Sequence, residues 1–295
     1  MKKKIGTLLL CILVVCLFLP AEGHADAGPK PSVNVTFENM GDELCYGTLL
    51  SKTDSTGPYS AWDGDEEHIY NYDLPDEIWA AFVEYEDPDG YCFLQTGWLC
   101  SETKELSWTY YPPSDFKILL YYPESGAFVT SEAYERYAFD SYYIVNMAGV
   151  EPKEEGLQSA LLLARRSYDY TWEAVPLVCR IVITVLLEIG IALLFGFREK
   201  KQLILILTVN AVTQIVLNVL LNIINYSQGG LAFMLFYVLF ELVVFVIEAV
   251  AFSALLRRVS EKRVPGWKPV VYALAANIVS FGGGWLAAQW VPGIF

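Results

Sequence analysis

The sequence predicts an exported all-β, sandwich-like domain followed by a four-helix α-helical transmembrane bundle. Hydrophobic residues make up 54% of the 295 residues and concentrate in the leader and in the last third of the chain. Residues 231–256 are apolar apart from two acids, and at ~1.5 Å per residue they can cross the ~30 Å hydrocarbon layer. Between these regions, short apolar runs alternate with turn residues, which is typical of a β domain.

Residues 1–27 have the features of a secretory signal peptide. The chain starts with three lysines, continues with the apolar run 5–19, breaks at Pro20 and reaches small residues before residue 28. The alternative is an uncleaved anchor helix, but the apolar run is shorter than the ~20 residues that a span needs. The following domain is therefore expected outside the cytoplasm, most simply at the cytoplasmic membrane of a bacterium.

The predicted extracellular domain, residues 28–150, is acidic. Residues 28–170 carry 26 Asp and Glu against 8 Lys and Arg, while the net charge of the whole chain is −14. Such a surface repels nucleic acid and anionic lipid, so no nucleic-acid partner is expected. It suits a solvated exported domain, with an envelope component, a peptide or a small cationic ligand as the partner. The acidic loop 63–67 departs from the spacing of a calcium-binding EF-hand, and no metal is assigned to it.

Short alternating segments predict the strands of this domain. They are 32–37, 44–50, 108–111, 116–122, 127–130 and 141–145. A hairpin of strands 78–86 and 91–94 is predicted around Asp87-Pro88-Asp89-Gly90, because proline, acid and glycine suit a tight reversal.

Three of the six cysteines fall in the exported domain: Cys45, Cys92 and Cys100. An odd number permits at most one disulfide and leaves one free thiol. The sequence leaves the pairing open.

Residues 151–171 are expected to form a helical stalk that leads into the membrane. Four spans follow, joined by short connections: 172–197, 203–224, 231–256 and 267–291. Basic residues gather in the first and third connections, at Arg198, Lys200, Lys201, Arg257, Arg258, Lys262, Arg263 and Lys268. By the positive-inside rule these connections are cytoplasmic, which places the β domain and the C-terminus outside the cytoplasm.

Polar side chains inside the predicted spans form two groups according to depth. Five share a layer ~10 to 16 Å from the inner surface and make up a predicted intramembrane polar site: Glu188, Asn210, Gln214, Glu248 and Asn277. A second layer further out holds a predicted ion pair between Arg180 and Glu241, with Asn218 completing its hydrogen bonds.

Glu188 and Glu248 are the functional candidates. Two carboxylates close together at low dielectric hold one proton between them or bind a cation that lets both ionise. The alternative is a structural network in which neutral acids bond to amides. An intramembrane enzyme is least supported, because the one histidine left after leader removal, His68, lies outside the spans and the spans contain no aspartate. No catalytic residue and no cofactor are predicted.

Three stretches carry a resemblance to a known group of sequences. They are AGPKPS at 27–32, YYPPSDFKILLYYPE at 110–124 and ELVVFVIEA at 241–249. Together they resemble an uncharacterised family of bacterial membrane proteins with a signal peptide, an exported β domain and four C-terminal transmembrane helices. The resemblance implies this architecture and supplies no activity.

The function expected from these observations is that of an integral cytoplasmic-membrane protein with an extracellular sensing or binding domain. The alternative is a small transporter, or an ion- or proton-coupled module, that uses Glu188 and Glu248. Because four helices enclose little space, a homo-oligomer is a further possibility. The sequence does not identify the ligand, the transported species or a signalling partner.

Overall fold

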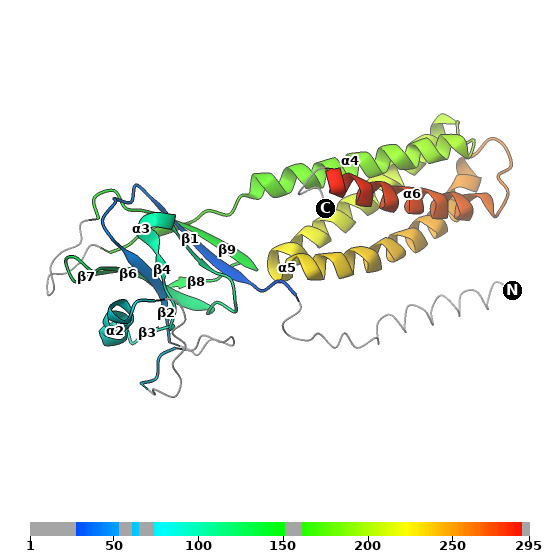
Figure 1. The fold of residues 1–295 in the computed structure, drawn as a ribbon. Coiled ribbons are helices and arrows are strands. Elements are labelled where there is room, and N and C mark those ends of the chain that lie inside the picture. The colour runs from blue at the N-terminus through cyan, green and yellow to red at the C-terminus, as the bar shows by residue number, and fades with distance from the viewer. Residues whose placement is uncertain (1–27, 53–60, 65–73, 151–160, 291–295) are drawn as a thin grey trace.

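The computed structural model describes residues 28–52, 61–64, 74–150 and 161–290, and the predicted signal peptide lies outside these residues. A β-sheet domain comes first in the chain and a set of long helices follows (Figure 1). The helices lie side by side and extend away from one end of the β domain.

The first sheet has four strands in the order β10-β9-β1-β5. β1 (Ser32–Glu38) is central, pairing in parallel with β9 (Asp140–Asn146) and antiparallel with β5 (Glu105–Trp108). The edge strand β10 (Ala164–Arg166) pairs antiparallel with β9. Strands close to the start and the end of the domain therefore complete one sheet.

The second sheet is antiparallel and has six strands around β2 (Tyr46–Ser51) and β6 (Asp115–Tyr122). β6 also pairs with β7 (Ala127–Thr130) and β8 (Tyr134–Glu135). β2 also pairs with β3 (Cys92–Phe93) and β4 (Trp98–Leu99), and a short helix, α3 (Cys100–Thr103), follows β4.

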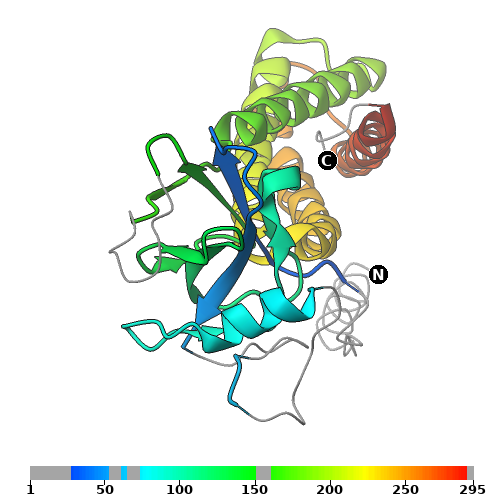
Figure 2. The same cartoon turned by 60° about the vertical axis from the view of Figure 1, so that its left-hand side comes forward.

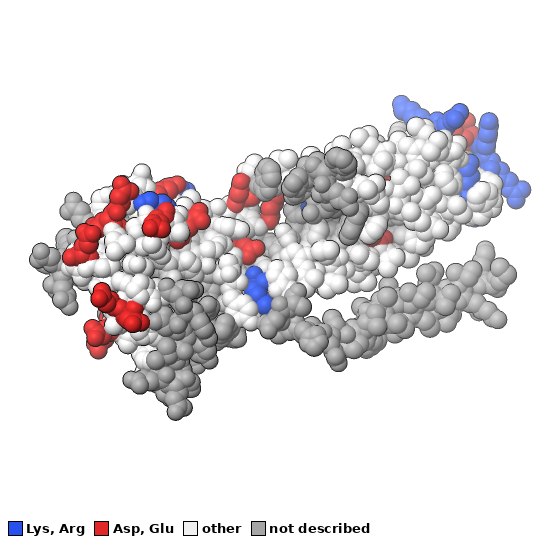
Figure 3. Space-filling model, viewed as in Figure 1, with Lys and Arg blue, Asp and Glu red and all other residues white. Residues whose placement is uncertain are grey.

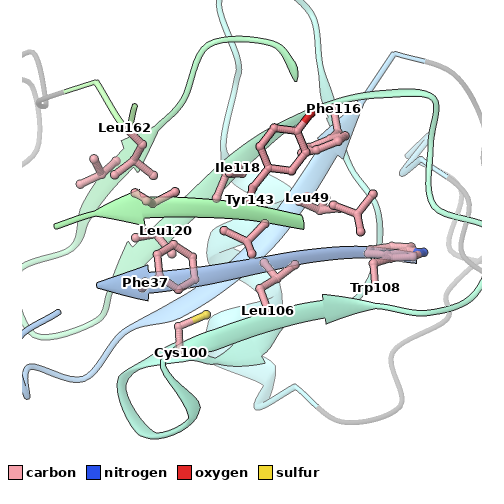
Figure 4. Close-up of a cluster of buried hydrophobic side chains, with 14 of the residues drawn as sticks. Phe37, Leu49, Cys100, Leu106, Trp108, Phe116, Ile118, Leu120, Tyr143 and Leu162 are labelled. Carbon is pink, nitrogen blue, oxygen red and sulfur yellow. The ribbon is translucent and has the colours of Figure 1, made fainter. Parts of the chain in front are cut away.

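The main core lies between the two sheets (Figure 4). Val35, Leu106 and Tyr143 come from the first sheet, and Leu49 and Ile118 come from the second. Inward-facing apolar residues recur at every second position of β1, as expected for a strand with one buried face. The predicted two-sheet architecture of this domain is confirmed.

The expectation of an all-β domain is wrong at residues 78–86. This segment contributes to the helix α2 (Asp76–Glu84), which packs on the second sheet through Ile78 and Phe82 (Figure 1 and Figure 2). Ile78 and Phe82 are four residues apart, which places both on one helical face. The acids Asp76 and Glu77 lie in the first turn, where the helix dipole favours negative charge. This helix buries the second face of β6, which explains why that strand is apolar along almost its whole length.

The reversal predicted at Asp87-Pro88-Asp89-Gly90 is confirmed. The Gly90 amide donates to the Asp87 carbonyl at 3.0 Å, and Gly90 adopts φ 76°, which favours glycine. The turn thus joins a helix to a strand instead of two strands.

The predicted helical stalk is also wrong where the structure describes it. Residues 151–160 lie outside the described residues, and Ala164–Arg166 form the strand β10. Arg165 and Arg166 extend an existing sheet edge, which satisfies their backbone groups better than an isolated short helix does.

The helical part contains α4 (Tyr170–Leu194), α5 (Lys200–Val259) and α6 (Lys268–Trp290). Gly229, with φ 81° and ψ 178°, interrupts α5 and joins two helical arms that fold back on each other (Figure 1). Among the described residues, two helices are long and apolar enough to cross a membrane, Glu173–Leu194 within α4 and the whole of α5. Four separate spans were predicted, and the middle two are the arms of α5; α6 is not one of the two candidates.

Candidate functional site

Polar side chains meet in the interior of the helical bundle, where α4, both arms of α5 and α6 come together. We call this group the acid–amide cluster, defined by Glu188, Asn210, Thr213, Gln214, Glu248, Asn277 and Ser280. Glu188, Asn210 and Glu248 are 0% exposed, and Gln214 is 1% exposed. Burial this complete is rare for a carboxylate and calls for polar partners.

The Glu248 carboxylate joins three helical segments. Its Oε1 accepts a hydrogen bond from Thr213 Oγ1 on the first arm of α5, at 2.7 Å. Its Oε2 accepts one from Asn277 Nδ2 on α6, also at 2.7 Å. The two donors fix the orientation of this carboxylate between the arms of α5 and α6.

The Glu188 carboxylate is less well satisfied. Its Oε1 accepts a weak bond from Ser280 Oγ at 3.4 Å, and its Oε2 has no hydrogen-bond partner among the described residues. Ser280 lies about one turn after Asn277, the residue that binds Glu248. One turn of α6 therefore contacts both acids, and the two carboxylates are close enough to interact electrostatically.

The amides that line the cluster retain unused bonding capacity. Gln214 Nε2 and Asn277 Oδ1 are buried without a hydrogen-bond partner in the described part of the chain. Asn218 Nδ2 bonds to the Gln214 carbonyl within its own helix, at 2.9 Å. If the cluster only held the helices together, these buried amide atoms would be expected to have hydrogen-bond partners. Their unused bonding capacity favours a binding site.

Arg180 contacts both arms of α5. Its Nη2 donates to Asn222 Oδ1 at 2.6 Å, and its guanidinium carbon lies 5.5 Å from the centre of the Phe233 ring. Glu241, the predicted partner, has a buried Oε2 with no hydrogen-bond partner among the described residues. Phe233 and Glu241 are on the same arm, about two turns or ~12 Å apart. The predicted ion pair between Arg180 and Glu241 stays a prediction.

Sequence reasoning brought out the acids and amides but missed the hydroxyls that hold them. Neither Thr213 nor Ser280 was predicted to belong to the site. Tyr272, whose hydroxyl donates to the Glu188 carbonyl at 3.3 Å, was also missed. The sequence did indicate a polar contact at Tyr272, because a tyrosine hydroxyl within an apolar span needs a hydrogen-bond partner.

A second feature that the sequence did not reveal is the contact between the β domain and the helices. We call it the Phe139–Gly229 junction. The Phe139 amide donates to the Tyr226 carbonyl at 2.8 Å, just before the interruption of α5. A Cβ atom on Gly229 would lie 2.6 Å from the Phe139 ring, so only glycine fits this contact. Tyr226 also packs against Tyr168, whose ring centre is 5.1 Å away.

In the β domain, the main buried charge is Lys117 of β6. Its Nζ donates to Asp87 at 2.9 Å and to Asp89 at 2.6 Å, and the Asp87 side chain is fully buried. Burial alone would lower the pKa of Lys117, but the hydrogen bonds to Asp89 and Asp87 outweigh it and raise the pKa above its ordinary value. The same bond lowers the pKa of Asp89. This triad locks the turn after α2 to the second sheet.

Comparisons of the chain with protein-family models, curated proteins and solved structures give no match. The function is therefore argued from the residues and contacts described above.

Proposed function

We propose that the chain is an integral protein of the cytoplasmic membrane whose β domain lies outside the cytoplasm and senses or binds a ligand there. In this proposal α4, the two arms of α5 and α6 each cross the bilayer. Large apolar side chains point outward on all four, including Leu186, Ile215, Val250 and Ile278, which are between 49% and 66% exposed. Water would oppose such exposure, whereas lipid favours it.

The charge distribution supports the proposed orientation. Lys and Arg gather at the end of the helices far from the β domain, and acids dominate the visible face of that domain (Figure 3). The exposed basic residues at the helix ends are Arg198, Lys200, Lys201, Arg257, Arg258, Lys262 and Arg263. The positive-inside rule assigns this end to the cytoplasm.

The observation that carries the sensing role is the Phe139–Gly229 junction. A domain that served only as a tethered binding module would be joined to the membrane by a flexible linker. Here a backbone hydrogen bond and a ring that excludes any Cβ atom join the domain to the turn of α5. A ligand that shifts Phe139 therefore also shifts both arms of α5, and with them the contacts of Glu248.

The native cysteines test the proposed location. Cys92 is exposed, whereas Cys45 and Cys100 are buried. Burial raises the pKa of the Cys45 thiol to about 12 and also raises that of Cys100, so neither forms the reactive thiolate readily. A membrane-impermeant maleimide added to intact cells is expected to label the β domain, and C92S is expected to abolish that label, as measured by a gel shift.

The matched control places a thiol at the other end. In the C92S background, K262C is expected to react only after the membrane is permeabilised. Labelling of K262C in intact cells, or of Cys92 only after permeabilisation, would reverse the proposed orientation. The labelled full-length protein then serves to test binding: because the domain is acidic, an oligolysine peptide is expected to bind in a salt-dependent way and an oligoglutamate peptide is not.

A second candidate function is a proton- or ion-coupled transport module. The unpartnered Glu188 Oε2 next to Glu248 favours it, since intramembrane acids mark ion and proton pathways. Proteoliposomes that contain the wild type are expected to dissipate an imposed proton gradient, as followed with a pH-sensitive dye in the lumen. The E188Q/E248Q double variant is expected to leave the gradient at the rate of empty vesicles. Equal rates for wild type and double variant would exclude this candidate. We propose no enzymatic activity.

A further inference from the structure

We infer that the acid–amide cluster binds one hard monovalent cation of the sodium class. The inference rests on the second candidate function only for the membrane setting of the cluster, and it specifies the ion.

The donor atoms define the chemical class of the ligand. Three cluster atoms among the described residues lack hydrogen-bond partners and can bind a cation, and all are oxygens: Glu188 Oε2, Asn210 Oδ1 and Asn277 Oδ1. Asn277 and Ser280, one turn apart on α6, bond to Glu248 and Glu188 respectively. Carboxylate and amide oxygens select hard cations over the soft metals that thiolates prefer.

The charge of the cluster sets the charge of the ligand. Arg180 is the only basic residue in Tyr170–Leu194, it bonds to Asn222, and the arms of α5 and α6 have basic residues only near their ends. Two ionised carboxylates would therefore lack compensation in a medium of low dielectric. A bound cation supplies this compensation.

The hydrogen bonds of Glu248 favour a single charge over a divalent ion. Both of its oxygens already accept bonds at 2.7 Å, from Thr213 and Asn277. Calcium takes six to eight oxygen ligands and several carboxylate oxygens. With one carboxylate oxygen left wholly unsatisfied, the cluster suits an ion that needs fewer ligands and less negative charge.

The test uses the purified full-length protein in lipid nanodiscs. Binding of radioactive sodium is measured at pH 8, and thermal unfolding is measured in sodium chloride against choline chloride at equal ionic strength. We expect about one sodium per chain at pH 8. We also expect the unfolding temperature to rise by ~4 °C or more once sodium exceeds its dissociation constant ~100-fold.

Variants separate a binding site from a structural network. E188Q and E248Q are expected to lose at least ~90% of the bound sodium. Because these variants also alter packing, a matched pair of threonines provides a milder test. The hydroxyl oxygens of Thr208 and Thr213 each lie within 3.1 Å of a carbonyl oxygen of their own helix, but only that of Thr213 also lies 2.7 Å from Glu248 Oε1. T213V is expected to weaken sodium binding ~10-fold by releasing Glu248, and T208V to leave it unchanged.

Three outcomes would overturn the inference: no sodium bound by the wild type at pH 8, binding that is equal in wild type and E188Q/E248Q, or binding of calcium without sodium. Transport is distinguished from binding by sodium flux in proteoliposomes. Sodium binding without flux excludes the transport candidate and supports the cation site. Proton flux with no bound sodium supports transport and overturns the cation site.

Discussion

The variant G229A is expected to weaken the contact between the β domain and the helices and to destabilise the full-length protein by ~2 to 4 kcal/mol. The backbone conformation of Gly229, φ 81° and ψ 178°, is essentially restricted to glycine and costs other residues ~1 to 3 kcal/mol. The added Cβ would also lie 2.6 Å from the Phe139 ring, so that ring must move. Hydrogen exchange at the Phe139 amide, which bonds to Tyr226, is expected to accelerate.

The neighbouring glycine provides the control. A Cβ atom on Gly230 would meet nothing within 4 Å, and alanine favours a helix over glycine by ~0.5 to 1 kcal/mol. G230A is therefore expected to be neutral or slightly stabilising. F139A in the G229A background is expected to recover the part of the loss that comes from the clash, but not the backbone strain. Equal unfolding temperatures for G229A and G230A would show that the junction does not constrain the chain.

The variant K117M is expected to destabilise the β domain by ~3 to 5 kcal/mol. The substitution leaves the fully buried Asp87 side chain without its cation. Removing one partner of a buried ion pair typically lowers the free energy of unfolding by ~3 to 5 kcal/mol. The Asp87 Oδ1 atom also accepts the amides of Asp89 and Tyr91, so the whole turn loses its anchor. D89N is expected to cause a much smaller loss, because the Asp89 side chain is 65% exposed.

The same triad predicts a pH dependence. The lowered pKa of Asp89 gives a stabilisation that is fully present above the ordinary aspartate value of ~3.9 and is lost as the pH falls through the lowered value. The raised pKa of Lys117 gives a second stabilisation, which is fully present below the ordinary lysine pKa of ~10.4 and is lost as the pH rises through the raised pKa. Chemical unfolding followed by tryptophan fluorescence should show both slopes in the wild type. Unchanged slopes in K117M would contradict the assignment to this triad.

Much of the β domain follows from the alternation of apolar residues. The strands expected at 32–37, 116–122, 127–130 and 141–145 match β1, β6, β7 and β9 closely. The segment 78–86 was misinterpreted because DEIWAAFVE contains large apolar residues that suit a strand, while Ile78 and Phe82 also share a helical face. Whether this segment becomes a strand or a helix depends on tertiary packing against the second sheet. The outer face of that sheet is apolar and is buried by the helix, and this requirement arises only once the sheet has formed.

For the acid–amide cluster, spacing along each helix indicated which residues face inward, since polar groups avoid lipid. Contacts between helices depend on hydroxyl positions and rotamers, which spacing does not specify. The Thr213–Glu248 bond and the Arg180–Asn222 bond are both of this kind. Depth along the helices grouped Arg180 with Glu241 and Asn218, and it did not indicate the contact with Asn222.

The strand β10 ends at Arg166 and α4 begins at Tyr170, only a few residues later. In the proposed topology, the sheet around β1 lacks β10 until residue 166 has emerged from the translocation channel, because β10 and β9 complete that sheet. By then the first span has already reached that channel. In the proposed topology, late closure of the sheet therefore exerts a pulling force on the nascent chain, and this force coincides with the lateral release of α4 into lipid.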